Sequence, residues 1–237
     1  LNYVNYNLVN PREAVKVTLR QNENWSNAIQ KLPPSVTRED ARILEYNFFN
    51  LENSFQGGNE FRFFDIRTLR ANGQNVAGIK TNADGTEVAL LTDKPQPNQA
   101  YSQVTDMNGN FVVDNYEFSN GNTQADYAKV KFRLESPEIP DAKVHIFGTL
   151  TNWQPNADNQ MHYSVDLQAY TGELLLKQGY YNFKYILEKQ GKLDLNYFDG
   201  SRFETENVYE IIVYYRPQGS RADLLIGYKF LRSRTDR

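Results

Sequence analysis

Short stretches in which apolar and polar residues alternate follow one another along most of the chain. Residues 14–20 read Ala-Val-Lys-Val-Thr-Leu-Arg, and within residues 127–134 the apolar Val130, Phe132 and Leu134 alternate with lysine and arginine. A period of two residues is typical of a β-strand that buries one face. The pattern therefore predicts an all-β fold.

Two segments near the N-terminus are less regular. The polar residues 22–31 could form one helical turn. Thr37-x-x-Asp40 could open a short helix, because threonine is a common residue at a helix N-terminus. Residues 43–46 fit a strand equally well, so both structures remain open for this segment.

Turn signals divide the rest of the chain. Asn72-Gly73, Asp84-Gly85 and Asn108-Gly109 are each flanked by apolar residues, which predicts successive β-hairpins. Residues 119–124 are polar and rich in asparagine and glycine, as expected of a domain boundary. We therefore expect residues 1–124 to form one β-rich, sandwich-like domain.

Residues 125–237 are expected to form the second domain. Strand patterns occur at residues 127–134, 143–148, 162–167, 173–177, 180–187, 208–215 and 224–230. Seven short strands separated by turns are typical of an immunoglobulin-like β-sandwich.

Composition supports a folded protein and excludes several classes. The 237 residues are 40% hydrophobic and 14% aromatic, which is enough apolar surface for a core. A formal net charge of −3 lacks the basic excess that a nucleic-acid partner requires. The chain has no cysteine, and no apolar run approaches the roughly 20 residues that span a bilayer, so direct membrane insertion is not expected.

Residues 57–67 read Gly-Gly-Asn-Glu-Phe-Arg-Phe-Phe-Asp-Ile-Arg and predict a strand that is covered on both sides. The strand begins after Gly57 and Gly58. Glu60 and Arg62 would share one face, and Asp65 and Arg67 the other. We expect each acid to pair with the arginine two residues later, which gives these charges a structural role.

No motif predicts catalysis. The sequence lacks a phosphate-binding loop, a serine elbow and a zinc-binding helix, and its two histidines, His145 and His162, have no nucleophile or metal ligand nearby. The stretch from Asp106 to Asn110 resembles the start of a calcium loop, but Phe111 replaces the required glycine, which favours a hairpin turn. We expect no catalytic residue, metal or cofactor. A hydrolase with two carboxylates brought together by the fold remains an alternative.

One constellation in the second half resembles a carbohydrate site. Trp153 follows the segment Phe147–Asn152, and Lys184 lies in Gly-Tyr-Tyr-Asn-Phe-Lys-Tyr, an order that is similar to the glycogen- and starch-binding, early-set β-sandwich modules. The resemblance implies that Trp153 stacks on a sugar and that Lys184 binds hydroxyl groups. Only Tyr197 and its neighbour Phe198 stand near the place of the family's second tryptophan, so α-glucan binding is the alternative function. A role for Trp153 as an anchor in the core is favoured.

Three longer strings together resemble one family, the plug proteins of the bacterial type IX secretion system. They are residues 57–67, residues 174–185 (Leu-Leu-Leu-Lys-Gln-Gly-Tyr-Tyr-Asn-Phe-Lys-Tyr) and residues 211–217 (Ile-Ile-Val-Tyr-Tyr-Arg-Pro) with the following residues 221–227. The resemblance spans nearly the whole chain and corresponds to the later part of the family. Members of that family begin with a signal peptide and a further β-rich segment, so the resemblance implies that both lie upstream of Leu1.

The resemblance implies a non-enzymatic protein of the periplasm. Such a protein caps the periplasmic opening of a large outer-membrane translocon barrel and prevents leakage when no substrate fills the pore. The expected partner is therefore that barrel.

Overall fold

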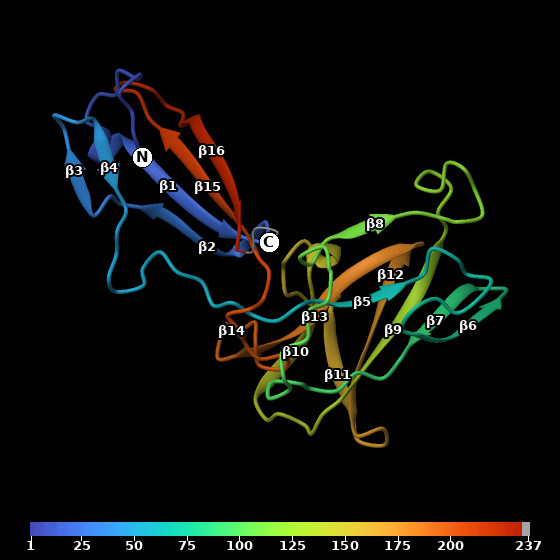
Figure 1. Cartoon of the computed structure of the whole chain (residues 1–237). Helices are drawn as coiled ribbons and strands as arrows, with labels where there is room; N and C mark the ends of the chain where they lie inside the picture. The colour runs from blue at the N-terminus through green and yellow to red at the C-terminus, as the bar shows by residue number, and fades with distance from the viewer. Residues whose placement is uncertain (234–237) are drawn as a thin grey trace. The chain divides into compact units, whose positions relative to one another are not determined.

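The computed structural model describes residues 1–233 as a nearly all-β protein (Figure 1). Its helical elements are α1 (Pro11–Ala14) and a single 3-10 turn, η1 (Thr149–Thr151). The strands are β1 (Val15–Gln21), β2 (Asn24–Leu32), β3 (Val36–Arg38), β4 (Ile43–Glu45), β5 (Arg62–Asp65), β6 (Val76–Asn82), β7 (Gly85–Leu90), β8 (Phe111–Val113), β9 (Tyr127–Glu135), β10 (Ala142–Phe147), β11 (Gln160–Ser164), β12 (Ala169–Lys177), β13 (Gly179–Lys189), β14 (Lys192–Asp194), β15 (Val208–Tyr215) and β16 (Leu224–Arg232). Within the described residues, no helix has the length and apolar character needed to cross a membrane.

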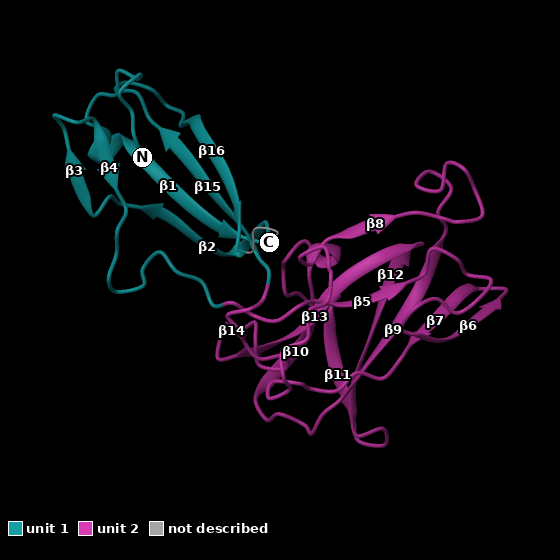
Figure 2. Ribbon diagram, viewed as in Figure 1, with its two compact units in different colours: residues 1–56, 206–237 teal, residues 57–205 magenta. Residues whose placement is uncertain are grey.

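The chain forms two compact units (Figure 2). Unit 1 combines Leu1–Gln56 with the chain from Glu206 onward, and unit 2 is Gly57–Thr205. This division differs from the expected boundary between residues 124 and 125. Backbone pairing explains the difference, because β1 pairs along its whole length with β15, whereas β5 and β8 pair with β13. The chain leaves unit 1, builds unit 2 and then returns.

Unit 1 contains an antiparallel sheet in the order β16-β15-β1-β2. The strand predicted at residues 14–20 is confirmed as β1. Val15 and Val17 are buried on one face with Val213 and Tyr215 of β15, although Thr18 on the other face is buried as well. Leu44 of the β3-β4 hairpin belongs to the same core. Thr37 lies in β3, which pairs with β4, so the short helix considered there does not form.

The helical turn considered for residues 22–31 is wrong, because this segment forms β2. The strand lies at one edge of the sheet and pairs with β1 with two register shifts. An edge strand needs only its backbone to join a sheet, so its polar side chains remain in water and leave no clear alternating pattern.

A ladder of side chains crosses all four strands on the other face of this sheet. The guanidinium of Arg20 lies 4.6 Å from the centre of the Trp25 ring and donates hydrogen bonds of 2.5 and 2.7 Å to the Glu210 carboxylate. The Tyr228 hydroxyl donates to the same carboxylate at 2.7 Å. Strands β2, β1, β15 and β16 are therefore joined by side chains as well as by backbone bonds.

Unit 2 is built on a nearly closed, barrel-like sheet. Its strand order is β14-β13-β10-β11-β12-β9-β7-β6, and β5 and β8 also pair with β13. The Asp65 amide donates to the Gln74 carbonyl at 3.0 Å, which joins the end of β5 to the segment that leads into β6. Neighbouring strands are antiparallel except β7 and β9, which are parallel.

The core of unit 2 is aromatic. Phe64, Phe132 and Phe183 lie with their ring centres 5.3–5.6 Å apart in edge-to-face contacts. The strands predicted at residues 127–134, 143–148, 162–167, 173–177 and 180–187 are confirmed within one or a few residues, as β9 to β13. Among the three predicted hairpin turns, Asp84-Gly85 joins two paired strands, β6 and β7.

The strands predicted at residues 208–215 and 224–230 also form, as β15 and β16. Strand β15 pairs with β1 and with β16 in unit 1, so both strands lie outside the sheet of β9 to β13.

We predict that Glu210→Gln makes the unfolding of the chain less sensitive to acid. Burial alone would raise the pKa of Glu210, but hydrogen bonds from Arg20 and Tyr228 lower this pKa below its ordinary value of 4.5. Because the folded pKa is depressed, the ionised carboxylate stabilises the fold above pH 4.5, and this contribution is lost as the pH falls through the folded pKa.

Urea unfolding at neutral pH and at about pH 3 tests this prediction. The variant should be less stable at neutral pH by about 1–3 kcal/mol, and the difference from the unmodified chain should shrink in acid. Glu13→Gln, which changes an exposed carboxylate of α1, is the control. Equal acid sensitivity of the unmodified chain and Glu210→Gln would contradict the role given to Glu210.

Candidate functional site

A pocket of about 250 Å³ in unit 2 brings together part of the first string of the family resemblance. Charged and amide side chains line it, namely Asn59, Glu60, Arg62, Asn75, Asp93, Gln96 and Gln99, with Phe61, Phe63 and Phe183 among the apolar residues. A pocket in which several polar groups converge on an apolar wall is the usual place to look for a binding or active site.

Arg62 is the central residue of this site. Its Nη1 donates to Asp93 at 2.7 Å, and its Nε and Nη2 donate to Asp199 at 3.1 and 2.7 Å. Nη2 also donates to the Lys94 carbonyl at 2.7 Å, and the guanidinium lies 5.5 Å from the centre of the Tyr185 ring. The side chain of Arg62 is only 10% exposed, and its hydrogen bonds go to two carboxylates and one backbone carbonyl of the protein itself.

Asp93 is held from two sides. The Tyr185 hydroxyl donates to one carboxylate oxygen at 2.8 Å, while Arg62 donates to the other. Burial raises the pKa of Asp93, although Arg62 and Tyr185 act in the opposite direction. Burial also raises the pKa of Tyr185 well above its ordinary value. A carboxyl group with a raised pKa suits proton transfer, but both oxygens of Asp93 are already bonded to other side chains.

Lys184 directly precedes Tyr185 in β13 and is also buried. Its Nζ lies 4.3 Å from the centre of the Phe61 ring, a distance typical of a cation–π contact. Burial lowers the pKa of Lys184, while the negative charges of Asp199, Asp106 and Glu60 oppose this effect. The ammonium group is therefore enclosed by an aromatic ring and acidic residues.

The two ion pairs predicted within residues 57–67 have different outcomes. Asp65 and Arg67 pair as expected, with 2.6 Å between Asp65 Oδ2 and Arg67 Nη2. The pair Glu60–Arg62 is wrong, because Arg62 is taken by Asp93 and Asp199, whereas the Glu60 carboxylate accepts a hydrogen bond from the Tyr101 hydroxyl. Glu60 precedes β5, so the alternation of that strand does not fix the direction of its side chain.

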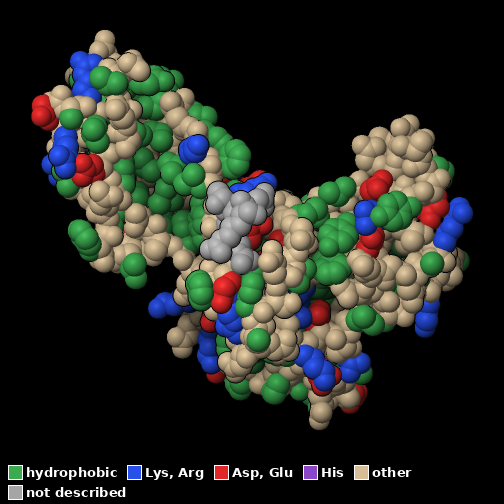
Figure 3. All heavy atoms as spheres, in the orientation of Figure 1, with side chains coloured by type: hydrophobic (Ala, Val, Ile, Leu, Met, Phe, Trp, Pro, Cys, Tyr) green, Lys and Arg blue, Asp and Glu red, His purple; other side chains and the backbone are tan. Residues whose placement is uncertain are grey.

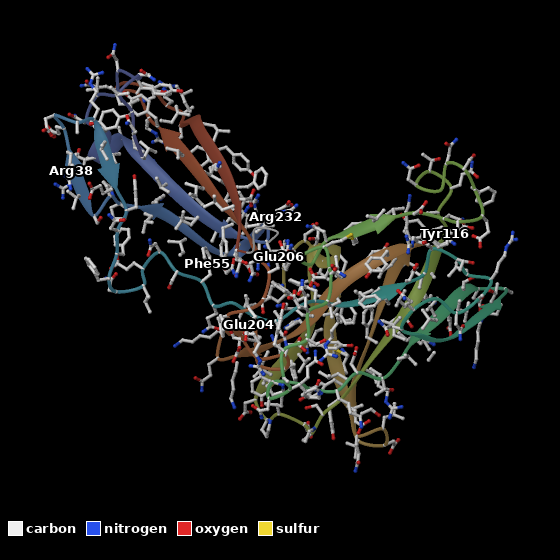
Figure 4. The ribbon with its side chains drawn as sticks, viewed as in Figure 1. Arg38, Phe55, Tyr116, Glu204, Glu206 and Arg232 are labelled. Carbon is white, nitrogen blue, oxygen red and sulfur yellow. The ribbon has the colours of Figure 1, made fainter. Side chains whose placement is uncertain are left out.

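Arg67 also stacks on an aromatic residue. Its guanidinium lies 4.5 Å from the centre of the Tyr116 ring, which is labelled in Figure 4. The residue therefore links the end of β5 to the loop that follows β8, and this contact is structural.

Gly57 and Gly58 hold the segment that precedes β5 against the loop at residues 199–205. A Cβ atom on Gly57 would lie 2.1 Å from the Arg202 carbonyl oxygen, so only glycine fits there. Gly58 has a φ of +69° and its carbonyl accepts hydrogen bonds from the Arg202 amide at 2.7 Å and the Thr205 hydroxyl at 2.9 Å. Both glycines therefore have a structural role, since they allow the backbone before β5 to pack against residues 199–205.

Trp153 lies inside unit 2 with 6% of its surface exposed. Its ring centre is 5.4 Å from that of Phe147 and 6.0 Å from that of Phe61. Gly109 packs so closely on the ring that a Cβ there would lie 2.4 Å from a Trp153 carbon. Because the ring is covered, it is not presented for stacking on a sugar.

The three residues of the carbohydrate resemblance do not form one exposed surface. Trp153 and Lys184 both contact Phe61, and both are buried. Tyr197 is 44% exposed and packs edge-to-face on Phe198, with 4.9 Å between the ring centres.

Of the remaining candidates for metal binding or catalysis, His162 is exposed, whereas His145 and Asp106 have internal partners. His145 is buried, and its ring nitrogens lie 3.1 Å from Asn159 Oδ1 and 3.0 Å from Glu188 Oε2. The Asp106 carboxylate accepts the amides of Phe61 at 2.5 Å and Asn108 at 2.7 Å, as in a structural turn. The residues that the structure describes contain no group of three or more acids or histidines that could hold a metal ion.

Asp93, Asp199 and Tyr185 were not predicted as members of the site. They lie 31, 137 and 92 positions from the residues that they bond. Asp93 forms an isolated bridge with Leu134 and Asp199 belongs to a loop, so neither lies in a strand whose period would indicate the direction of its side chain. The sequence alone therefore does not show that charged residues from distant positions gather beside β5.

We predict that Arg62→Ala destabilises the chain by about 3–5 kcal/mol, because it leaves Asp93 and Asp199 without their shared partner. Arg67→Ala, at a side chain that is 27% exposed, should cost about 1 kcal/mol. Urea unfolding of both variants measures the difference. Equal losses would show that Arg62 does not hold the site together.

We also predict that Gly57→Ala lowers the free energy of unfolding by about 1–3 kcal/mol, because the new methyl group collides with the Arg202 carbonyl. Gly78→Ala in β6 is the matched control, since a Cβ there meets nothing within 4 Å, and its effect should stay within about 0.5 kcal/mol. A Gly57→Ala variant as stable as the control would contradict the close approach.

Comparisons with known proteins show that the fold is similar to that of a solved structure. No protein-family model and no curated protein matches the chain. The chain is similar to the crystal structure of a hypothetical protein from Parabacteroides merdae ATCC 43184, with a TM-score of 0.91 and 30% sequence identity over 98% of this chain. The match covers 58% of that protein, so the chain spans little more than half of its length. The two-unit β architecture described above is therefore shared with part of a longer bacterial protein.

Proposed function

We propose that this chain belongs to a non-enzymatic periplasmic protein that binds the outer-membrane translocon barrel of the type IX secretion system and plugs it. The resemblance of three strings to the plug family motivates the proposal. Their positions in the fold support it, since residues 57–67 and 174–185 meet in the pairing of β5 with β13, and residues 211–217 lie mainly in β15, the strand between β1 and β16. The strings are thus fold-determining parts of both units.

The observation that carries the proposal is the exposed apolar surface of β16. Large hydrophobic side chains of this strand are exposed, namely Leu224, Leu225, Tyr228, Phe230 and Leu231. Figure 3 shows hydrophobic side chains gathered on unit 1. A cluster of exposed apolar residues on a folded protein is characteristic of a surface that docks on another protein.

The bonding of the charged residues supports a docking body. Arg62, Asp93 and Asp65 are bonded within the protein, and these bonds join loops to strands. A plug has to resist deformation when it closes a pore, and a buried network of charged hydrogen bonds stiffens the unit that contains it.

We also propose that strands β9 to β14 are related to the immunoglobulin-like, early-set β-sandwiches. Antiparallel strands β9, β12, β11, β10, β13 and β14 follow one another in one sheet. The similarity of residues 147–185 to glucan-binding modules concerns the same strands. Such a scaffold would serve here as the body of the plug, with Trp153 in its interior.

Crosslinking of the tagged full-length protein in its native bacterium tests the proposed partner. Crosslinks should be formed before the membranes are dissolved, because a transient interface can bury less than about 1,200 Å². We expect mass spectrometry to identify the outer-membrane translocon barrel among the crosslinked proteins. An untagged strain is the control, and recovery of no outer-membrane barrel would contradict the proposal.

Permeability of the cells gives a second test. A strain that lacks the protein should admit a large hydrophilic antibiotic that the outer membrane normally excludes, and the restored gene should reverse this sensitivity. Unchanged sensitivity would argue against a plugging role.

A further inference from the structure

Strand β16 forms an open edge of the sheet in unit 1. It is the terminal strand in the order β16-β15-β1-β2. From Gly227 to Arg232 every residue pairs with β15 in unbroken register. A regular edge strand presents free backbone donors and acceptors along its outer side, and another strand can pair with them.

The direction of each backbone group on β16 follows from its pairing. The Ser233 amide donates to the Asn207 carbonyl at 2.9 Å, which makes these residues a hydrogen-bonded pair. Because such pairs alternate in an antiparallel ladder, Tyr228, Phe230 and Arg232 direct their amide and carbonyl groups away from β15. The outer edge therefore offers three successive pairing positions.

The opposite edge of the same sheet is protected. Strand β2 pairs with β1 through two register shifts, and its Lys31 has a left-handed backbone with φ of 56°. Such irregularities are a common way to prevent unwanted strand pairing. From residue 227 onward β16 has no register shift, so the sheet is blocked at one edge and open at the other.

The open edge carries uncompensated positive charge. Neither Lys229 nor Arg232 forms an ion pair within the described chain, and Arg232 is labelled at the end of β16 in Figure 4. Two nearby acids are already paired, Glu210 with Arg20 and Asp223 with Arg216 and Lys16, while the charge of Glu23 acts on Tyr228. The charge complementary to this edge is therefore negative.

Apolar side chains lie on both faces of the edge. Adjacent residues of a strand point to opposite faces, so Phe230 and Leu231 present apolar surface on different sides. Phe230 is 56% exposed and Leu231 46% exposed. A strand added beside β16 would cover apolar groups above and below the sheet.

From these observations we infer that the outer edge of β16 is a strand-addition site for an extended segment of another protein, one that combines apolar with acidic side chains. The inference rests on the proposed function only in that it requires a partner protein. Backbone bonds to residues 228, 230 and 232 would hold the segment, and Lys229 and Arg232 would select its acidic residues.

A photo-crosslinker placed at Leu225 of the full-length protein, in its native bacterium, tests the site. We expect crosslinks to a segment that contains both acidic and apolar residues. Phe230→Pro should reduce the yield at least tenfold, because proline removes an outward amide without removing a bond to β15. Phe230→Thr keeps that amide and should retain more of the yield than Phe230→Pro.

Charge reversal tests the chemistry of the partner. The double variant Lys229→Glu/Arg232→Glu should lower the crosslink yield at least tenfold, whereas Lys80→Glu, at an exposed lysine of β6, should leave it unchanged. A circular dichroism spectrum and a melting curve for each variant show that unit 1 still folds. If the folded double variant crosslinks as well as the unmodified protein, the acidic character of the partner is refuted.

The outcomes separate this inference from the proposed function. Crosslinks from Leu225 to a protein other than the translocon barrel, sensitive to Phe230→Pro, would support the site and contradict the proposed partner. Crosslinks to β16 of a second copy, or equal yields from Phe230→Pro and Phe230→Thr, would overturn strand addition by another protein. No crosslink from Leu225, while the barrel is still captured through other positions, would overturn the site alone.

Discussion

The bonding of Arg62 to two acids, the buried Asp199 and the half-buried Asp93, is the constraint on which unit 2 depends. One guanidinium joins β5 to Asp93, which follows β7, and to Asp199, which follows β14. Tyr185 of β13 completes the arrangement through Asp93. A buried charge is tolerated only when its partners are in place, so these segments have to close together around Arg62. The pocket beside it is thus a consequence of how the barrel-like sheet closes.

Much of the fold could be predicted from the sequence, because most strands bury one face. Val15 and Val17 in β1 and Val130 and Phe132 in β9 show the period of two that burial imposes. The domain division could not be read in this way. Residues near Val15 pair with residues near Tyr215, and nothing local in either strand indicates the other. The same holds for β2, whose backbone joins the sheet while most of its side chains are polar.

The candidate site was predicted in part for a similar reason. The pair Asp65–Arg67 follows from alternation within one strand and is present. The partners of Arg62 come from distant positions outside the named strands, and a sequence offers no means of choosing them among 29 acids. Trp153 shows the limit of motif similarity, since matching the order of a binding motif does not determine whether the ring is exposed. Packing against Phe61 and Phe147 decides that.

The two units have different roles in the proposed plug. Unit 2 bonds the charged groups around Arg62 internally, whereas unit 1 leaves one sheet edge open, apolar and positively charged. Hydrogen–deuterium exchange of the full-length protein, with and without the purified translocon barrel, tests this account most directly. The amides of Tyr228, Phe230 and Arg232 should exchange rapidly in the free protein and slowly when the barrel is present, while those of Gly227 and Lys229 stay protected throughout. Rapid exchange at all three outward amides in the presence of saturating barrel would contradict docking through β16.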